Sequence, residues 1–571
     1  MTDASTLLPL LIGVPIIGAA LAVLAPWLWA RRTLVYAVPF AALAGSVALI
    51  VHHGSTPVEA VGFGAYVPGV AIPFVSDTFS ALMLAVCSGV AILAIWLSDA
   101  TGEIRRSRFF PSLVLLLLGG VNGALLTADL FNLFVWVEVM LMPSYALLAL
   151  AGGAKRIAAG RLFVVINLLT STLLVAGVGL VYAVSGSVNL AALAGAARED
   201  GRLAFALGLV VLALCIKSGA VPVHGWLPQT YPSTSSGVMA LFAGLHTKVA
   251  LYAVIRIWTT AFDLDPAWGW IMLAAALTTT LVGAIASASG SRIRGVLAWQ
   301  MVSGVGVILA SLAVGTTRVS GEQGPQLATS IVAIALTGAI VYMIHHMLTI
   351  GGLLSAFGAF EHHYGAPRLT GQGALRGMWW RERWMALVSI VLIASLIGLP
   401  LTSGLVAKFE VVRAGAEAGG WPGLTMLAAV CVGWFIGLIA MIRLWKHTMW
   451  DTEDEGDEDA EDDEAPAEIQ DADSGDEAAA PVRRMPATLT APAVIFAAAS
   501  MAMFFGYQPL AQIVDRAVVG LIDTRGYVEA VLGSDAIDGE YMVPPLDPDA
   551  EFRPLAGDDA AETVGAERGD R

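Results

Sequence analysis

The hydrophobic pattern divides most of the chain into long apolar stretches separated by short polar connections. A helix that crosses a bilayer needs about 20 mostly apolar residues. Fourteen stretches fit this length, near residues 5–30, 33–53, 74–98, 109–127, 129–152, 159–186, 203–222, 236–260, 268–288, 294–314, 328–358, 384–414, 424–447 and 487–510. The pattern therefore predicts an all-α polytopic membrane protein with about fourteen transmembrane helices.

The same pattern predicts how the chain is organised. No basic segment precedes the first stretch, so it is interpreted as a retained spanning helix and not as a cleavable signal. The predicted parts are three N-terminal helices (1–108), a first five-helix repeat (109–260), a second five-helix repeat (268–447), an acidic loop (448–486), a last span (487–510) and an amphipathic segment with an acidic tail (511–571).

Composition supports a membrane protein and locates the charge outside its spans. Of 571 residues, 57% are hydrophobic and 13% are charged, about half the charged share of soluble domains. The net charge is −15, yet residues 1–450 carry +8. The acids gather in 451–478, which holds 16 acids and no base, and in 515–571, with a net charge of −9. A solvated spacer is the favoured role for both segments, and the composition after about 533 predicts poor order.

The number of Lys and Arg residues alternates between high and low from one connection to the next. One set of alternate loops carries 16 of them, and the intervening set carries five, namely Arg198, Arg202, Arg256, Arg318 and Arg413. The positive-inside rule places the richer set in the cytoplasm. Fourteen helices then put both termini outside and the acidic loop inside. The three cysteines, Cys87, Cys215 and Cys431, lie far apart in apolar stretches and are expected to be small core residues.

The stretch 511–532 has helical apolar spacing. Two alternatives stay open for it: it lies on the membrane surface or on a partner, or it is a solvated extension.

Glu138 is a charge in the middle of a predicted spanning helix, ADLFNLFVWVEVMLMPSYALLAL. An ionisable group there costs roughly 2.5–3.5 kcal/mol on insertion scales, so a functional role is predicted. Asp129 begins the same helix, where an N-cap and an accessory role both remain open.

Lys217 lies in VVLALCIKSGAVPVHGWLPQTYP, where Gly219 and Pro222 interrupt the helix and His224 follows. An interrupted helix at membrane depth is tolerated where it lines a cavity or is buried in protein. A Lys at such a break can exchange a proton, and we predict that Lys217 does so, with His224 as an accessory group.

Two further spans carry bases near their middle. Lys248 lies in GVMALFAGLHTKVALYAVIRIW, two residues after His246, which is an accessory candidate; the two side chains therefore point to different helix faces. His345 and His346 lie in a long span that Gly351 and Gly352 can bend. Histidine suits a proton relay because it titrates near neutrality; hydrogen-bonded, buried neutral histidines are the alternative.

Lys408 follows a second interruption, GLPLTSG, with Glu410 as an accessory candidate two residues later. Interrupted helices in both halves of a chain are typical of inverted-repeat transporters. Together, the acid, the lysines and the imidazoles form a row over five helices that suits proton movement, because a charge arriving on one group shifts the next. There is no phosphate loop, haem or iron–sulfur spacing or nucleophile motif, and no cofactor or metal is predicted; HHY at 362–364 is favoured as surface histidines.

Four segments carry a family resemblance. FNLFVWVEVMLMPSY, KSGAVPVHGWLPQTYPSTSS, HTKVALYAVIRIW and GLPLTSGLVAKF resemble the antiporter-like proteins of Mrp-type sodium/proton antiporters, which are related to the proton-pumping membrane subunits of NADH–quinone oxidoreductase. The resemblance covers about residues 75–450. The length and the fourteen predicted helices are most similar to those of the D subunits.

The resemblance implies a proton pathway and two departures from the family pattern. Its implied members are the glutamate of the fifth helix, the bases of the seventh, eighth and twelfth helices, and the histidines of the eleventh: Glu138, Lys217, Lys248, Lys408, His345 and His346. Ile350 stands where the family usually has a Lys, and AWQMVSGVG replaces a more polar run. The central relay is therefore expected to depend more on the two histidines and ordered water.

The predicted function is that of a membrane subunit in a hetero-oligomeric Na+/H+ antiporter of a bacterial-type plasma membrane, with no role in binding nucleic acid. One alternative is a proton-pumping subunit of a redox complex, which would also hold no redox cofactor in this chain. A structural scaffold with inert charges is disfavoured, because buried charges are costly.

Overall fold

A computed structural model describes residues 4–63, 71–150, 152–317, 325–370, 374–451 and 484–533. Its long helices are α1 (Ala4–Leu24), α2 (Leu28–His52), α3 (Thr78–Ala100), α5 (Phe110–Leu126), α6 (Leu130–Ala149), α7 (Ala154–Ser185), α9 (Gly201–Ser218), α11 (Ser236–Thr260), α12 (Pro266–Ser289), α13 (Ile293–Thr316), α14 (Pro325–Tyr364), α16 (Arg383–Ile397), α17 (Ser403–Ala418), α18 (Gly420–Trp445) and α19 (Ala487–Phe505). The other elements are α4 (Glu103–Arg106), α8 (Ala196–Glu199), α10 (Trp226–Thr230), η1 (Tyr231–Ser233), α15 (Met378–Arg381), η2 (Lys446–Trp450), α20 (Tyr507–Ile522), α21 (Arg525–Leu532), β1 (Val58–Phe63) and β2 (Ile72–Asp77).

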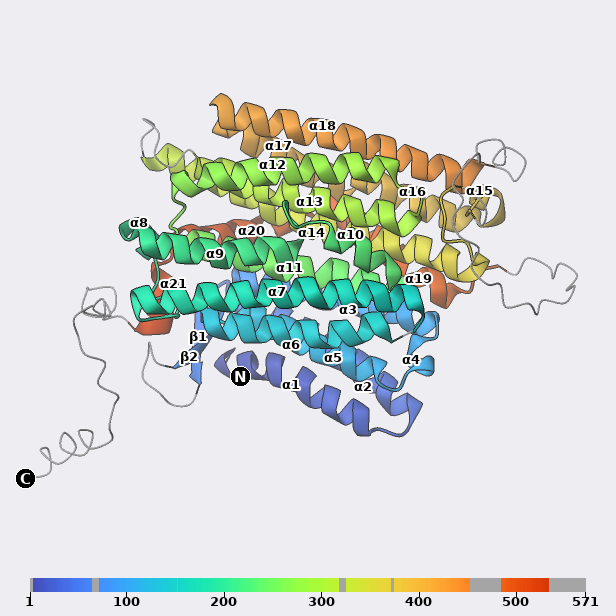
Figure 1. The fold of residues 1–571 in the computed structure, drawn as a ribbon, viewed down its shortest axis with the longest axis horizontal. Helices are drawn as coiled ribbons and strands as arrows, with labels where there is room; N and C mark the ends of the chain where they lie inside the picture. Colours follow the sequence, from blue (N-terminus) through green and yellow to red (C-terminus); the bar gives the residue numbers. More distant parts are fainter. Residues whose placement is uncertain are drawn as a thin grey trace, which may run out of the picture.

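The long helices run side by side in one bundle (Figure 1). Among the described residues, twelve helices are long and apolar enough to span a membrane, and two shorter apolar helices are Phe110–Leu126 and Arg383–Ile397. Each of the fourteen predicted stretches corresponds to one of these helices, and stretch 384–414 also contains most of α17 beyond its interruption. The membrane fold is confirmed, while the symmetry of the two five-helix repeats stays a prediction.

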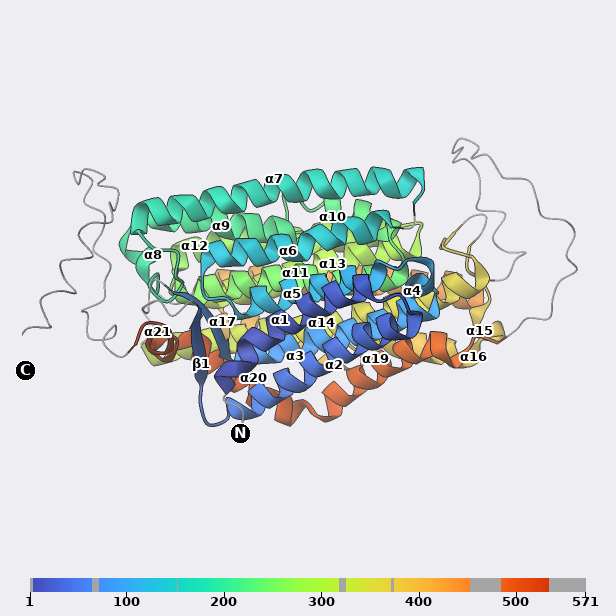
Figure 2. The ribbon, with the colours of Figure 1, turned by 90° about the horizontal axis from the view of Figure 1, so that it is seen from below.

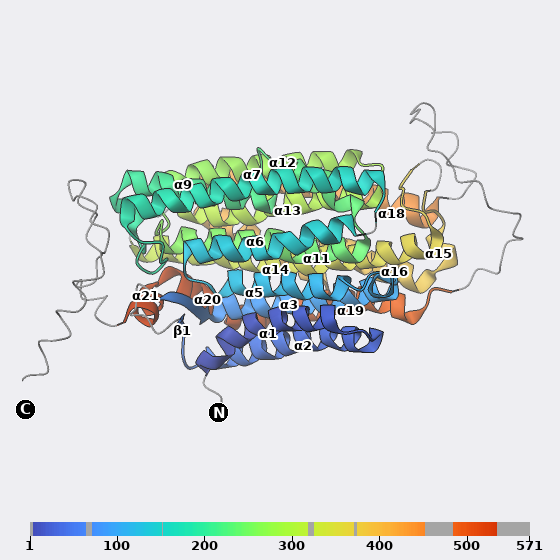
Figure 3. The same cartoon turned by 60° about the horizontal axis from the view of Figure 1, so that its bottom comes forward.

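The most buried helices lie at the centre of the bundle. The apolar window of α11 is wholly buried and that of α13 is 94% buried, compared with 28% for Gly420–Trp450 at the periphery. Figure 3 shows α11 and α14 in the middle, between α12 on one side and α1 and α2 on the other. A helix that is apolar all round belongs in such a position. The charges that α11 carries are therefore held away from both lipid and water.

Both predicted interruptions are present. α9 ends at Ser218, followed by Gly219 in the left-handed region with φ of 89°. α16 ends at Ile397, followed by Gly398 with φ of 93°. Glycine adopts this conformation without the strain that a side chain would bring, so each helix stops at a defined residue.

The two ends of the bundle differ. Figure 2 shows β1, α8 and α21 at one end and α4 and α15 at the other. α4 and α15 carry Arg105, Arg106 and Arg381 of the predicted basic set, and α8 carries Arg198 of the other set. The predicted alternation thus corresponds to opposite ends, and which end faces the cytoplasm stays a prediction.

The antiparallel pair β1–β2 is a feature that the sequence pattern did not predict. Its register joins Val58 to Asp77 and Phe63 to Ile72. β2 ends at Asp77, whose side chain accepts from the amide of Ser80 and so caps α3. The hairpin therefore sets the start of a helix in the bundle.

The charge alternation counted Arg256 as a residue of a connection, but the structure places it within a helix. It is inside α11, is 5% exposed and pairs with Asp77 at 2.7 Å. Its guanidinium also lies 5.2 Å from the ring centre of Tyr527 in α21. Arg256 therefore belongs with the buried charges of the bundle and not with the charges of the connections.

The amphipathic stretch 511–532 packs on this chain, so it is not a solvated extension; a position on the membrane surface or on a partner stays a prediction. α20 buries Val514, Ala517, Val518 and Leu521, and α21 buries Tyr527, Val531 and Leu532 beside β1. Nearly all of the acidic loop and the tail after 533 lie outside the described residues. Of the cysteines, Cys87 is buried as expected, but Cys431 is exposed and Cys215 is half-buried.

Candidate functional site

Glu138 and Lys217 are brought together by α6 and α9. The Nζ atom of Lys217 lies 3.9 Å from Oε1 of Glu138. Ser171 of α7 stands between them: its hydroxyl donates to Glu138, and it accepts from Nζ of Lys217 at 2.8 Å. The side chain of Lys217 is 5% exposed and that of Glu138 is 18% exposed. A bridging hydroxyl therefore connects the acid to the base.

Lys217 is placed by the end of α9. Just before the break, the carbonyl of Ile216 accepts from the indole of Trp226 at 3.0 Å, which anchors α10 against the helix end. His224 lies in the break, with its ring 5.7 Å from that of Trp299. The interruption thus holds Lys217 at a fixed position, and His224 lies on the side of α13.

His246 faces Lys217 across a small cavity. The cavity measures about 10 Å³, and both side chains line it; this is room for about one water molecule. Nε2 of His246 lies 2.8 Å from the hydroxyl of Ser144, and Nδ1 lies 3.2 Å from that of Tyr231. Of the residues that line this cavity, Lys217 and His246 are the titratable ones.

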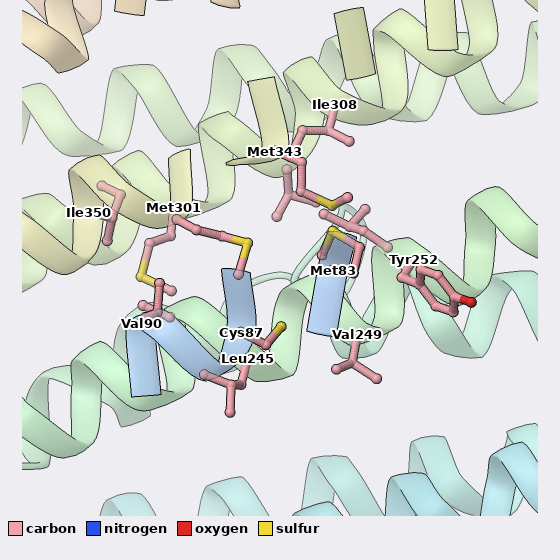
Figure 4. Close-up of a cluster of buried hydrophobic side chains, with 14 of the residues drawn as sticks. Met83, Cys87, Val90, Leu245, Val249, Tyr252, Met301, Ile308, Met343 and Ile350 are labelled. Atoms are coloured by element: carbon pink, nitrogen blue, oxygen red, sulfur yellow. The ribbon is translucent and has the colours of Figure 1, made fainter. Parts of the chain in front are cut away.

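Lys248 points to the other side of α11, as the two-residue spacing predicts. It is fully buried, and its Nζ donates to Oγ1 of Thr247 at 3.0 Å. Within the described part of the chain it forms no ion pair. Cys87 and His346 are among its electrostatic neighbours. Figure 4 shows Cys87 of α3 close to Leu245, which lies on α11 beside this lysine.

Ile350, which stands where the family pattern has a Lys, is part of the buried apolar cluster in Figure 4. It is 1% exposed. An apolar side chain cannot take or give a proton, so this turn of α14 offers no titratable group. His345 and His346, about one turn earlier, are the titratable groups of α14 nearest to this position along the helix.

His346 fits against the backbone of α13. Nε2 lies 3.4 Å from the carbonyl oxygen of Gln300, and the ring packs onto Gly304, where an added Cβ would overlap it. The preceding residue, His345, has Nδ1 2.8 Å from the hydroxyl of Ser403 in α17. The two histidines therefore face different helices.

Lys408 lies beside the second interruption. Its Nζ donates to the carbonyl of Ile397 at 2.6 Å, at the end of α16, and lies 4.7 Å from the ring centre of Trp434. A cation at a helix C-terminus is favoured by the helix dipole. Lys408 is also an electrostatic neighbour of His345, which extends the row to α17.

Two accessory candidates have structural partners. Asp129 accepts from the amide of Asn132 at 2.7 Å and caps α6, so the N-cap alternative is confirmed. Glu410 accepts from the hydroxyl of Tyr507 at 2.7 Å and pairs with Arg413 at 3.5 Å. Glu410 therefore links α17 to α20.

The comparisons with known proteins agree with one another. Residues 127–436 match the family model described as NADH:quinone oxidoreductase/Mrp antiporter, transmembrane. The D subunit of the Na+/H+ antiporter of Bacillus subtilis is 30% identical over 83% of this chain and 88% of its own length. That match extends the similarity well beyond the region of the family model.

The solved Mrp complex from Dietzia sp. DQ12-45-1b contains a chain with a TM-score of 0.82 and 36% identity, covering 93% of this chain and 100% of that one. The chain belongs to the NADH:quinone oxidoreductase/Mrp antiporter family. Respiratory complex I from Thermus thermophilus shares the fold, with a TM-score of 0.69 and 21% identity over 90% of this chain and 99% of that one. The family resemblance predicted from the sequence is thereby confirmed.

Gly304→Ala should displace His346 and slow any transport that uses it, because the new methyl group occupies the position of the imidazole. Gly295→Ala is a matched control on the same helix, since its nearest atom would be Cβ of Arg292 at 3.8 Å. Alanine favours a helix by roughly 0.5–1 kcal/mol over glycine, so the control should assemble normally. Transport assays on both variants test this; equal rates would show that transport does not depend on His346 in this position.

Proposed function

We propose that this chain is the D-type subunit of a multisubunit Na+/H+ antiporter and conducts protons along the row from Glu138 to Lys408. The linkage of Glu138, Ser171 and Lys217 carries this proposal. It joins a carboxylate to a buried amine through a hydroxyl at an interrupted helix, and such buried groups are rare and costly unless they serve a function. The names of the relatives supply the ions, Na+ and H+.

The geometry supports a stepwise mechanism. A proton that reaches Glu138 removes its negative charge and weakens the attraction that holds Lys217 protonated. Lys217 then releases its proton across the cavity toward His246. On the far side of α11, Lys248, His346, His345 and Lys408 continue the row, each responding to the charge of its neighbour.

In this mechanism the proton pathway crosses from one face of α11 to the other. His246 and Lys248 are two residues apart and face different halves of the bundle. A proton that passes from one half to the other therefore crosses the plane of this helix. We infer that α11 separates a first half-pathway, which contains Glu138 and Lys217, from a second one, which ends near Lys408.

The chain is a multi-pass membrane protein whose relatives are bacterial transporter subunits. We propose that it works as a secondary transporter subunit in the plasma membrane with both termini outside. Sodium movement would be coupled to the protonation changes through the other subunits of the complex.

Sodium-driven pH change in everted vesicles tests the function. The whole gene cluster is expressed in sodium-sensitive cells, and addition of Na+ should change the internal pH only when this chain is present. Omitting the chain while keeping the other subunits is the control. If the same complex moved protons only on supply of an electron donor and acceptor, the chain would instead serve a redox-driven pump.

A further inference from the structure

Four hydroxyl groups lie in one buried cluster beside His345. They come from four helices: Thr349 of α14, Ser395 of α16, Ser403 of α17 and Ser500 of α19. All four side chains are fully buried. Ser500 lies 2.8 Å from Ser395 and 2.8 Å from Ser403, and Ser395 lies 3.1 Å from Ser403 (oxygen to oxygen).

His345 touches this cluster at two points. Its Nδ1 lies 2.8 Å from the hydroxyl of Ser403 and 3.2 Å from that of Thr349. Thr349 in turn lies 2.9 Å from Ser395. Two parallel branches therefore lead from one nitrogen of His345 into the cluster.

The cluster makes more short polar contacts than it has protons to form hydrogen bonds. The four hydroxyls and Nδ1 of His345 make six contacts with one another. Each hydroxyl carries one proton and can accept two hydrogen bonds. Even with a proton on Nδ1, at most five of the six contacts are filled at once. The protons can therefore be arranged in several ways over the same oxygen positions, as a proton relay requires.

His345 is oriented to feed such a relay. Nδ1 faces the hydroxyls, while Nε2 has no hydrogen-bond partner among the described residues. An imidazole that gains a proton on one nitrogen becomes a donor on both and can release the other proton. Lys408 is the cationic neighbour of this ring.

We propose that Thr349, Ser395, Ser403 and Ser500 form a proton relay that takes the proton from Nδ1 of His345 and passes it toward the non-helical segment 398–402. This deepens the proposed function and rests on it. As an N–H bond at His345 breaks, an O–H bond forms at Ser403 or Thr349, and that hydroxyl gives its own proton to Ser395 or Ser500. The serine that accepts this proton gives its own proton to a water molecule at segment 398–402. Each oxygen ends with one proton, so the relay is ready for the next.

One of the four hydroxyls, that of Ser500, comes from α19, the last span. Ser500 lies outside residues 127–436, the part matched by the family model, and outside both predicted five-helix repeats. It also accepts from the backbone amide of Ser403 at 3.3 Å, at the start of α17. The last span would therefore complete a pathway that the two repeats begin.

The two branches allow a sharp test in the assembled complex. Thr349→Val removes one branch without changing side-chain size, and Ser403→Ala removes the other. Each single variant leaves one branch, and its exchange rate should fall less than about threefold. The double variant isolates Nδ1, and its rate should fall about 100-fold, a typical loss for removal of a proton-transfer group and far more than the product of the single effects.

Matched variants separate a relay from a packing role. Thr349→Ser with Ser403→Thr exchanges the two side chains but keeps both hydroxyls, so exchange should stay within about threefold of wild type. Ser389→Ala removes a buried hydroxyl of α16 that, among the described residues, bonds only to the carbonyl of Met385 in its own helix, and it should have no effect. Co-purification of the partner subunits reports assembly for every variant.

The outcomes are decisive. An assembled Thr349→Val/Ser403→Ala variant that exchanges ions at more than one-ninth of the wild-type rate overturns the relay. Should that variant fail to assemble, Ser395→Ala/Ser500→Ala, which removes the two hydroxyls that both branches reach, must show the same large loss or the relay is wrong. Glu138→Gln in the same preparation distinguishes the two proposals: if it exchanges normally, the proposed pathway that begins at Glu138 fails, whatever the relay variants show.

Discussion

Glu138→Gln should abolish sodium-driven proton exchange while the complex still assembles. The amide has nearly the same shape and can still accept from Ser171, but it carries no charge and cannot take up a proton. Lys217 would then lose the charge that it faces at 3.9 Å. We expect a loss of at least about 100-fold, the range for removing a group that transfers a proton, measured as the initial rate of pH change after addition of Na+ to vesicles.

Asp129→Asn is the matched control for Glu138→Gln. It makes the same chemical change earlier in the chain, at the N-cap of α6, where asparagine caps about as well as aspartate. Exchange should therefore stay close to wild type. Equal losses in both variants, or normal exchange by Glu138→Gln, would remove Glu138 from the pathway.

Arg256→Met should destabilise the protein strongly. It leaves the carboxylate of Asp77 buried without its cation, and breaking a buried pair on one side costs about 3–5 kcal/mol. Burial alone would raise the pKa of Asp77, but Arg256 and the amide of Ser80 hold that pKa below its ordinary value. The loss should appear as a lower thermal unfolding midpoint and a lower yield of folded chain.

Asp77, the ion-pair partner of Arg256, provides an internal check on this prediction. Adding Asp77→Asn to Arg256→Met removes the uncompensated charge and should recover part of the lost stability. Arg198→Met is the exposed control, because Arg198 and Asp263 form a 2.7 Å pair with side chains 40% and 50% exposed. Such pairs are worth about 0–1 kcal/mol. A midpoint for Arg256→Met no lower than for Arg198→Met would show that the buried pair contributes nothing.

The span pattern could be predicted from the sequence because the bilayer imposes it. Apolar length and interrupting Gly and Pro residues act locally, so the fourteen stretches and both interruptions could be located. Charges in mid-span were equally visible, and Glu138 and Lys217 do lie together. The partners of these charged side chains depend on which helices pack together. The hydrophobic pattern of the sequence does not contain that information.

Three features escaped prediction for this reason. Ser171 is an ordinary hydroxyl in a spanning helix, and only packing of α7 against α6 and α9 makes it a bridge. Ser500 lies about a hundred residues from its partners Ser395 and Ser403. Arg256 was counted with the connections although it falls in the predicted span 236–260, and its partner Asp77 lies at the end of a hairpin that the sequence pattern did not predict.

The contact between Tyr527 and Arg256 has a consequence for biogenesis. Translation delivers Arg256 and Asp77 long before residues 525–532 leave the ribosome, so α21 can cover the pair only after the last span has been released into the bilayer. Until then, the guanidinium of Arg256 lacks the ring of Tyr527, which lies 5.2 Å from it in the finished fold. Burial of this ion pair is therefore completed by a segment that is made after all fourteen spans.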